Sequence, residues 1–538
     1  MTFSLHRRLF LQGSTLGLGA LAAPGLSQAV VAPGFTHGVA SGEPRQRSVM
    51  LWARHVPGGR LHWQMSRTPD FARIVAEGDA LADPEHDHCV KPVVTGLKPG
   101  RWYFYRFRDG NGAVSVTGRT RTLPEGRTDR FSLGVFSCAN LPFGWFNAYA
   151  HAAARRDLDL VVHLGDYFYE YPNGTYPSAK EAMPGRLLDP PGEAFALEGY
   201  RRRYAAYRAD PDLQALHRLF PMVMMWDDHE SANDSWSGGA ENHQPAKEGP
   251  WSVRKAAAQR AYREWLPISE NAWEAYQIGD LATLFRPETR LSARSEPPDY
   301  GRVIAGRQDV KGALAAFRDG AWRDPGRTML GSEQEAWLGA SLRRSTRQGT
   351  RWQVLAQQTV MGQLMLPLEA KGWIAPDAPE FIRKRSALAL AASALDMPLN
   401  LDSWDGYPAA RDRLLRSALD ADANLLVLSG DSHNGWAFDL TLDGHPAGAE
   451  IAGHSVTSPG FEAYAPGTRP TDIARALLAR NPGLRWTDTS RRGYAVLTLT
   501  PEVAFADWVL LEGVRERGTS VAGVRRMSAA RGANRFSS

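Results

Sequence analysis

The sequence predicts a layered α/β domain preceded by a small all-β sandwich. Between about residues 35 and 124, apolar and polar residues alternate in short runs, as they do in half-buried strands. After Arg130, apolar strand-like runs are followed by long helical or loop segments, which is typical of layered α/β proteins. A chain of 538 residues has room for two or more such domains with large cores.

Residues 1–29 have the features of a twin-arginine export signal. Arg7 and Arg8 precede a small, apolar run at 13–23, and Ser27-Gln28-Ala29 offers a small-residue cleavage site. A membrane anchor is the alternative, but the run is rich in Gly and Ala and shorter than the ~20 residues that a span requires. We therefore expect the folded protein to leave through the twin-arginine export machinery, into the periplasm or the medium.

The composition is that of an ordinary globular protein. The formal net charge of +5 comes from 63 Lys and Arg scattered among 58 Asp and Glu, with no basic block before the last two dozen residues. This distribution does not favour a nucleic-acid partner. We expect a monomer that acts on a small molecule or a phospholipid.

The segment 33–125 is expected to form the sandwich. Its clearest strand-like runs are 48–53, 61–65 and 102–107, and Asp109-Gly110-Asn111-Gly112 is a strong hairpin signal. Nothing in this segment suggests catalysis, and we expect it to pack against or shield the larger domain. That larger domain is expected at 130–510, followed by a basic tail at 511–538.

Polar side chains follow four apolar runs of the larger domain. Because ligands bind at the carboxyl ends of the strands in such sheets, four polar ends indicate one shared site. Run 131–136 leads to Cys138 and Asn140, run 158–164 to Asp166 and Tyr169, run 222–226 to Asp228, His229 and Asn233, and run 425–428 to Asp431 and His433.

Each polar residue also has a simpler interpretation. Cys138 alone would be a small buried hydrophobe, Asp166 a cap or turn residue, Asp228 a surface turn and His433 a satisfied polar group. Four such groups, each placed directly after an apolar run, argue for a joint role, and Gly165 and Gly430 allow close approach of the backbone.

The donor types predict a metal centre. Oxygen donors mixed with a thiolate, a phenolate and an imidazole suit a pair of metals that includes a hard trivalent ion. One carboxylate that reaches both ions would hold them ~3.5–4 Å apart, as in two-metal hydrolytic sites.

The two cysteines have two possible roles. In an oxidising compartment, Cys89 and Cys138 either form one disulfide or at least one of them has another function. Cys138 follows an expected parallel strand, whereas Cys89 precedes a strand of the sandwich. We therefore predict that Cys138 is a metal-bound thiolate and is not bonded to Cys89.

Several motifs together resemble the PhoD family of alkaline phosphatases and phosphodiesterases. The similarity covers nearly the whole chain, in the same order, including the export signal and the amino-terminal sandwich. The motifs are GDYFYEY (165–171), WDDHE (226–230), MLGSEQEAWL (329–338), WDGYP (404–408), GDSH (430–433) and SVTSPG (455–460).

The resemblance implies a metallophosphoesterase-type catalytic domain with Fe3+ and Ca2+. Cys138, Asp166, Tyr169 and one member of the Asp431/His433 pair would surround the iron, with Asp166 bridging to calcium. Asp228 and Asn233 would be further ligands on the calcium side, and His229 and Asn140 would face the phosphate. The division of Asp431 and His433 between the two metals stays open.

One motif departs from the family pattern. Members tend to have Leu-Asp-Thr-Arg after a hydrophobic strand, whereas this chain has Arg286-Pro287-Glu288-Thr289-Arg290. The longer carboxylate puts the supporting role of the family's aspartate in doubt. Arg290 is retained and is expected to anchor a carboxylate or a phosphate; the alternative is a solvated arginine.

The predicted activity is hydrolysis of phosphate esters by hydroxide generated at the metal centre. Phospholipase D-like or phosphotriester hydrolysis on the same centre, and a non-catalytic exported metal-containing binding protein, are the alternatives. A serine hydrolase is disfavoured because the sequence after the signal contains no Gly-x-Ser-x-Gly. A zinc peptidase is disfavoured because it contains no His-Glu-x-x-His. The basic segment 515–535 would form either a helical lid over the site or a disordered tail.

Overall fold

The computed structural model describes residues 33–374 and 380–537. The expected export signal at 1–29 therefore lies outside the described residues. No described helix is both long enough and apolar enough to cross a membrane.

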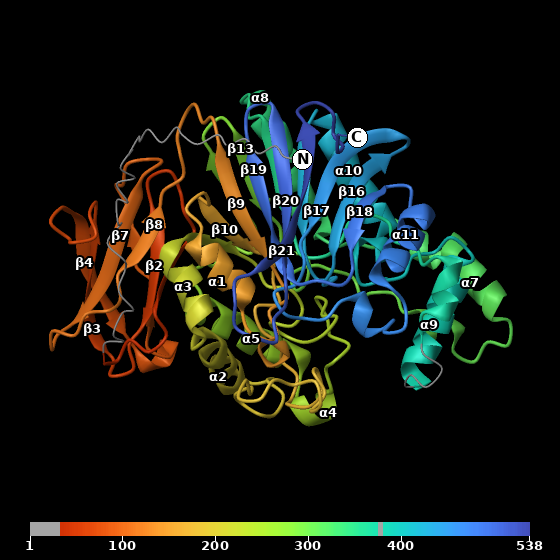
Figure 1. Ribbon diagram of the computed structural model, residues 1–538, viewed down its shortest axis with the longest axis horizontal. Helices are drawn as coiled ribbons and strands as arrows, with labels where there is room; N and C mark the ends of the chain where they lie inside the picture. The colour runs from red at the N-terminus through yellow and green to blue at the C-terminus, as the bar shows by residue number, and fades with distance from the viewer. Residues whose placement is uncertain (1–32, 375–379, 538) are drawn as a thin grey trace, which may run out of the picture.

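Two large β-sheets pack face to face in the centre of the molecule (Figure 1). The first has ten strands, in the order β21 (Val521–Ala530), β20 (Val503–Leu511), β19 (Gly493–Leu499), β9 (Phe131–Phe136), β10 (Leu160–His163), β11 (Pro221–Met224), β1 (Val39–Gly42), β2 (Val49–Arg54) and β5 (Cys89–Val90), with β6 (Val93–Val94) also paired to β2. The second has seven, in the order β12 (Glu274–Ile278), β13 (Ala282–Arg286), β14 (Trp352–Ala356), β15 (Leu425–Ser429), β17 (His445–Ala452), β16 (Gly435–Leu442) and β18 (Leu484–Asp488).

The period of two along each strand divides its side chains between two cores. Leu160 and Val162 point into the core between the sheets, whereas Val161 points into the core under the helices. In β15, Leu426 faces the other sheet and Val427 the opposite helix layer. Burial of both faces explains why these strands are continuously apolar in the sequence.

Helices cover the outer face of each sheet and complete four layers. The ten-stranded sheet is covered by α1 (Asn147–Ala154), α2 (Leu197–Arg208), α3 (Pro211–Leu219) and α5 (Trp251–Trp265). The seven-stranded sheet is covered by α8 (Gly331–Arg347), α10 (Pro408–Asp420) and α11 (Pro470–Arg480). At the periphery lie the short α4 (Pro245–Glu248) and a group made of α6 (Tyr300–Ile304), α7 (Val310–Asp319) and α9 (Glu380–Ser393).

The amino-terminal sandwich is present, but it is not separate from the central sheets. Its outer sheet has the order β4 (Ile74–Ala82), β3 (Gly59–Ser66), β7 (Trp102–Asp109) and β8 (Gly118–Arg121). Its other sheet consists of β1, β2, β5 and β6, and β1 pairs in parallel with β11 of the catalytic region. One core fills the space between these two sheets. The fold class is thus confirmed, and the sandwich is joined to the larger domain through a shared sheet.

The carboxyl-terminal segment differs from both arrangements considered for it. Residues of β21 pair antiparallel with β20 along its length and form the edge of the ten-stranded sheet. Arg526 forms an ion pair with Asp507 of β20 at 2.6 Å. Since a strand in register uses the backbone hydrogen bonds of 521–530, this segment is neither a helical lid nor a disordered tail.

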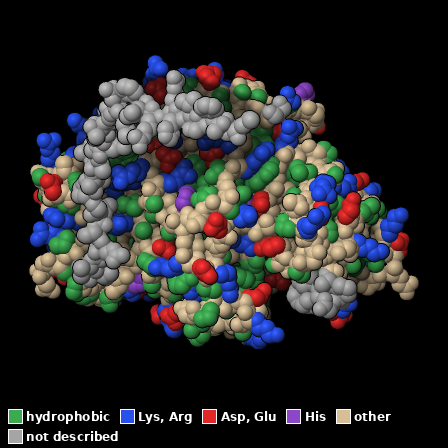
Figure 2. Space-filling view, viewed as in Figure 1, with side chains coloured by type: hydrophobic (Ala, Val, Ile, Leu, Met, Phe, Trp, Pro, Cys, Tyr) green, Lys and Arg blue, Asp and Glu red, His purple; other side chains and the backbone are tan. Residues whose placement is uncertain are grey.

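Lys and Arg side chains are interspersed with Asp, Glu and hydrophobic side chains on the face drawn in Figure 2. The charge distribution inferred from the sequence has the same mixed character.

Candidate metal centre

The four expected strand ends meet in three overlapping groups of side chains that could hold metal ions. Within each group, the ligand atoms lie within 4.8 Å of one another. The groups are Cys138 with Asp166 and His433, Asp166 with Asp228 and His229, and Asp227 with Asp228 and Asp431. Asp166 belongs to the first two groups and therefore links them.

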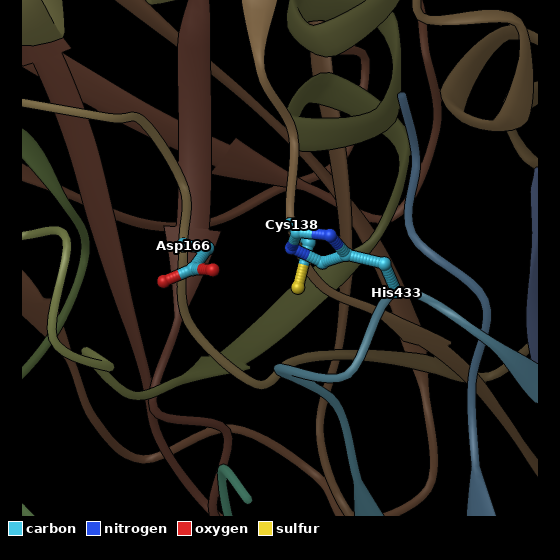
Figure 3. Close-up of side chains that lie close together, drawn as sticks. All are labelled: Cys138, Asp166 and His433. Carbon is cyan, nitrogen blue, oxygen red and sulfur yellow. The ribbon is translucent and has the colours of Figure 1, made fainter. Parts of the chain in front are cut away.

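The strands bring these residues together because they run parallel. β9, β10 and β11 are adjacent parallel strands, and β13, β14 and β15 are parallel in the facing sheet. Their carboxyl ends therefore open to one edge of the layered sheets. Figure 3 shows the Cys138 thiol and the His433 ring beside each other, with the Asp166 carboxylate reaching the same space from another segment.

The backbone at these strand ends has an unusual conformation. Cys138, Asp166, Asp431 and His433 have φ values of 60°, 51°, 61° and 63°. The left-handed region costs a non-glycine residue roughly 1–2 kcal/mol, so four such residues in one site indicate that the surroundings impose these turns. Gly165 supports the arrangement, since a Cβ there would lie 2.4 Å from Cβ of Asp227.

Sulfur, phenol and imidazole donors gather on one side of Asp166, which we call the mixed-donor side. The Tyr169 hydroxyl lies 3.0 Å from Oδ2 of Asp166 and 3.1 Å from Nε2 of His433. Ser458 donates a hydrogen bond to the Tyr169 oxygen at 2.8 Å. The Tyr169 phenol is therefore turned back toward Asp166.

Carboxylates gather on the other side, which we call the carboxylate side. Asp227, Asp228 and Asp431 converge there around the buried guanidinium group of Arg290. Arg290 pairs with Asp227, lies 3.6 Å from Asp228 and 3.7 Å from Asp431, and bonds to Asp402 at 2.6 Å. Arg290 is thus an anchor for carboxylates, and the interpretation as a solvated arginine is wrong.

The pKa values of the aspartates on the carboxylate side are strongly shifted from their usual values. Burial raises the pKa of Asp431 well above its usual value, and the charge of Asp227 adds to this shift. Against the effect of burial, Arg290 and His229 hold the pKa of Asp228 at about 2. One arginine among four carboxylates leaves an excess of negative charge that cations would compensate.

His229 is held by a buried carboxylate. Its Nδ1 lies 2.7 Å from Oε2 of Glu170, and its ring lies 4.1 Å from that of Tyr169. Glu170 also accepts hydrogen bonds from the backbone of Asn233 and the side chain of Asn242. Burial alone would lower the pKa of His229, but Asp228, Glu170 and Asp166 raise it well above its usual value. The other ring nitrogen is left free to face the centre.

The two predicted asparagines are placed differently. Asn140 is fully buried at the end of β9, its amide donates to the carbonyl of Tyr176 at 3.2 Å, and its Oδ1 has no hydrogen-bond partner. The Asn233 amide donates to the Glu241 carboxylate at 3.1 Å near the surface. Contact of Asn140 with phosphate and of Asn233 with calcium both stay predictions.

Three further residues of the site were not predicted from the sequence. Asp227 lies in the motif WDDHE (226–230) and Glu170 in the motif GDYFYEY (165–171), each next to a predicted site residue. Their charge and their position in these motifs could have identified them as members of the site. Asp402 has no comparable signal, because it follows no apolar strand run. Only the folded chain shows that Asp402 pairs with both Arg290 and Arg294.

Glu288 replaces the family's aspartate with a different set of contacts. Its carboxylate accepts hydrogen bonds from Nε1 of Trp226 at 2.8 Å and from the backbone N–H groups of Arg290, Leu291 and Ser292. The longer side chain therefore closes the turn that carries Arg290.

The donor set fits bound cations. Oδ1 of Asp166 and Oδ1 of Asp228 are buried without a hydrogen-bond partner, which is costly unless another group binds them. Burial, with the charge of Asp166 in addition, raises the pKa of the Cys138 thiol well above its usual value. A metal ion would reverse this effect by stabilising the thiolate. Cys89 and Cys138 are both free thiols, which confirms that they are not bonded to each other.

Comparison with known proteins shows the family of the chain. The family model described as PhoD-like phosphatase matches residues 133–508, and the one described as its N-terminal domain matches residues 20–124. Alkaline phosphatase D of Bacillus subtilis (strain 168) is 32% identical over 557 residues, which cover 96% of this chain and 86% of that protein. The solved structure titled "Structure of PhoD" superposes with a TM-score of 0.76 at 29% identity, covering 95% of this chain and 92% of the other.

These similarities and the fold define the protein as a phosphoric ester hydrolase. The chain belongs to the PhoD-like phosphatase family.

Proposed function

We propose that the protein is an exported alkaline phosphatase and phosphodiesterase that uses an Fe3+ and Ca2+ centre. The observation that carries the proposal is the double membership of Asp166, which belongs both to the Cys138 and His433 group and to the Asp228 and His229 group. Two metal sites that share a carboxylate are a common arrangement for phosphoester hydrolysis.

The two sides of the centre suit different ions. Cys138, Tyr169 and His433, together with Asp166, would hold the ferric ion, because thiolate, phenolate and imidazole suit a transition metal. Asp227, Asp228 and Asp431 would lie on the calcium side, because calcium takes oxygen ligands. When bound, the two cations would activate a water molecule and offset charge on the phosphoryl oxygens.

The chain's own residues would supply the remaining functions. His229, oriented by Glu170, would present its other ring nitrogen to a phosphoryl oxygen. Asn140 would be a second contact for the phosphate. Arg290 would keep the carboxylates of the calcium side in position through its ion pairs.

Substrate would approach from the side where the centre is least covered. The Asp431 side chain is 19% exposed, whereas Asp166 is 1% exposed. The twin-arginine motif at residues 7 and 8 supports export to the periplasm or the medium, where such an enzyme would release phosphate from esters.

The test is turnover of p-nitrophenyl phosphate and bis-p-nitrophenyl phosphate by protein matured through export, combined with metal analysis of the same sample. We expect turnover of both esters, with iron and calcium present. A metal content of zinc alone would contradict the assignment of the ions, and absence of turnover by metal-replete protein would contradict the function.

A further inference from the structure

We infer that a pocket beside the metal centre binds the second ester group of a phosphodiester, the one that stays on phosphorus. The pocket lies between the segment 233–241 and helices α6 and α9. The inference rests on the proposed function and adds to it a substrate class: diesters with a neutral, largely apolar alkyl or aryl group.

The pocket is of suitable size and lies next to the centre. Its volume is about 750 Å³, within the usual range for small-molecule sites. Asp234 and Asp402 belong to its lining, and both contact residues of the candidate metal centre. The backbone N–H of Asp234 donates to Oδ2 of Asp228 at 2.7 Å, and Asp402 bonds to Arg290 at 2.6 Å. The pocket lining is therefore in direct contact with the carboxylate side of the centre, through Asp234 and Asp402.

The far wall of the pocket is apolar and has a core of its own. Ile304, Leu388 and Leu401 line it, together with Tyr300. These side chains belong to a separate hydrophobic cluster formed by α6, α7 and α9 and the segment that follows α9. In Figure 1, α7 and α9 project from one end of the layered sheets. This peripheral group can thus shape a pocket without taking part in the main cores.

The lining of the pocket indicates which group it accepts. Acidic residues (Asp234, Glu241, Glu296, Asp299 and Asp402) and basic residues (Arg302, Lys384 and Arg385) both line it, so the pocket favours neither an anionic nor a cationic group. The apolar side chains of Ile304, Leu388 and Leu401 favour alkyl or aryl surface. In hydrolysis, a water oxygen bonds to phosphorus and the bond to the leaving alcohol breaks. A proton passes to the departing oxygen or to solvent, and the group in the pocket stays on the phosphate.

The experiment compares p-nitrophenyl alkyl phosphates whose second group is methyl or hexyl, using the full-length, metal-replete enzyme. For the wild type we expect kcat/KM to be at least about tenfold higher for the hexyl than for the methyl diester. Ala387, exposed on α9 and part of the lining, is replaced in Ala387→Trp to fill the pocket. The hexyl-to-methyl ratio should then fall to about one.

Two further variants make the result independent of folding defects. Leu388→Ala removes apolar surface without adding bulk and should lower the ratio several-fold. Ala316→Trp, at an exposed position of α7 outside the pocket, is the matched control and should leave the ratio unchanged.

The outcomes separate the subsite from the proposed function. A wild-type ratio near one, or a ratio that neither pocket variant changes, overturns the subsite alone. If the wild type hydrolyses neither these diesters nor p-nitrophenyl phosphate, both the proposed function and the subsite are overturned.

Discussion

The two sides of the metal centre differ in chemistry although they share Asp166. On the mixed-donor side, Cys138, Tyr169 and His433 bring sulfur, phenol and imidazole. On the carboxylate side, three aspartates surround the buried Arg290. The donors of the mixed-donor side differ in type. Those of the carboxylate side are all carboxylates, which repel one another and need the fixed positive charge of Arg290 to stay together.

This difference indicates how each side is kept in place. Constrained backbone turns hold donors on both sides, since Cys138 and His433 on the mixed-donor side and Asp431 on the carboxylate side all have positive φ. The carboxylate side depends in addition on electrostatics, because Arg290 offsets part of a repulsion that would otherwise separate the aspartates. We therefore expect the first side to retain its metal strongly and the second to exchange its metal.

The largest expected effect is that of Asp166→Asn, which removes the shared charge. Loss of the bridge should weaken both metals and lower kcat at least about 1000-fold, since each 1.36 kcal/mol of lost stabilisation is tenfold in rate. Kinetics and metal analysis check this. Asp507→Asn, which changes a buried aspartate on β20, is the control and should remain active. Substantial activity in Asp166→Asn would show that the two sides work independently.

Removal of calcium is expected to have the next largest effect. A calcium-selective chelator should abolish turnover while iron stays bound, because oxygen-donor calcium sites exchange readily. Activity should return when calcium is added back. Full activity of protein shown to be free of calcium would refute the proposed difference in lability.

Glu170→Gln should reduce kcat by roughly 10–100-fold, the range seen when an outer partner of a metal site is altered. The change weakens the hold on His229 at 2.7 Å, so kcat should fall more than KM rises, with metal content unchanged. Glu193→Gln is a matched control, because Glu193 also accepts a hydrogen bond from Asn242 but pairs with Arg254 and not with His229. A loss of equal size in both variants would point to a general structural effect.

Tyr169→Phe tests the mixed-donor side through colour. A phenolate bound to ferric iron absorbs visible light, so the wild type should be coloured and the variant should lose or strongly shift the band. The effect on rate should be smaller than that of Asp166→Asn. Tyr176→Phe, which changes the neighbouring ring, should keep the band. A fully active wild type without visible absorption would disprove the iron assignment.

The smallest effect is expected for Glu288→Asp, which restores the family's residue on the carboxylate side. The shorter side chain should lose some of its bonds to Trp226 and to the turn at 290–292, lowering the free energy of unfolding by about 1–2 kcal/mol. Urea unfolding measures this. The exposed Glu502→Asp serves as control and should change stability by less than about 0.5 kcal/mol.

Most of the fold was predictable because the strands obey local rules. The expected run 131–136 coincides with β9, and 425–428 differs from β15 by one residue, since strands buried on both faces are continuously apolar. The parallel arrangement then places Cys138, Asp166, Asp228 and Asp431 at one edge. That step needs only the direction of the strands, so these site residues could be named from the sequence.

The sequence by itself determined the layers, the strand ends and the types of donor, because each depends on neighbours along the chain. Only the tertiary structure decided the pairing of β1 with β11, the position of β21 at the edge of a sheet and the contact of Asp402 with Arg290. The pairing of β1 with β11 and the contact of Asp402 with Arg290 join residues more than a hundred positions apart in the sequence. The strand β21 is close to β20 in the sequence, but its residue pattern would fit several partner strands. The energy of these contacts comes from burial and charge that exist only once the layers have packed.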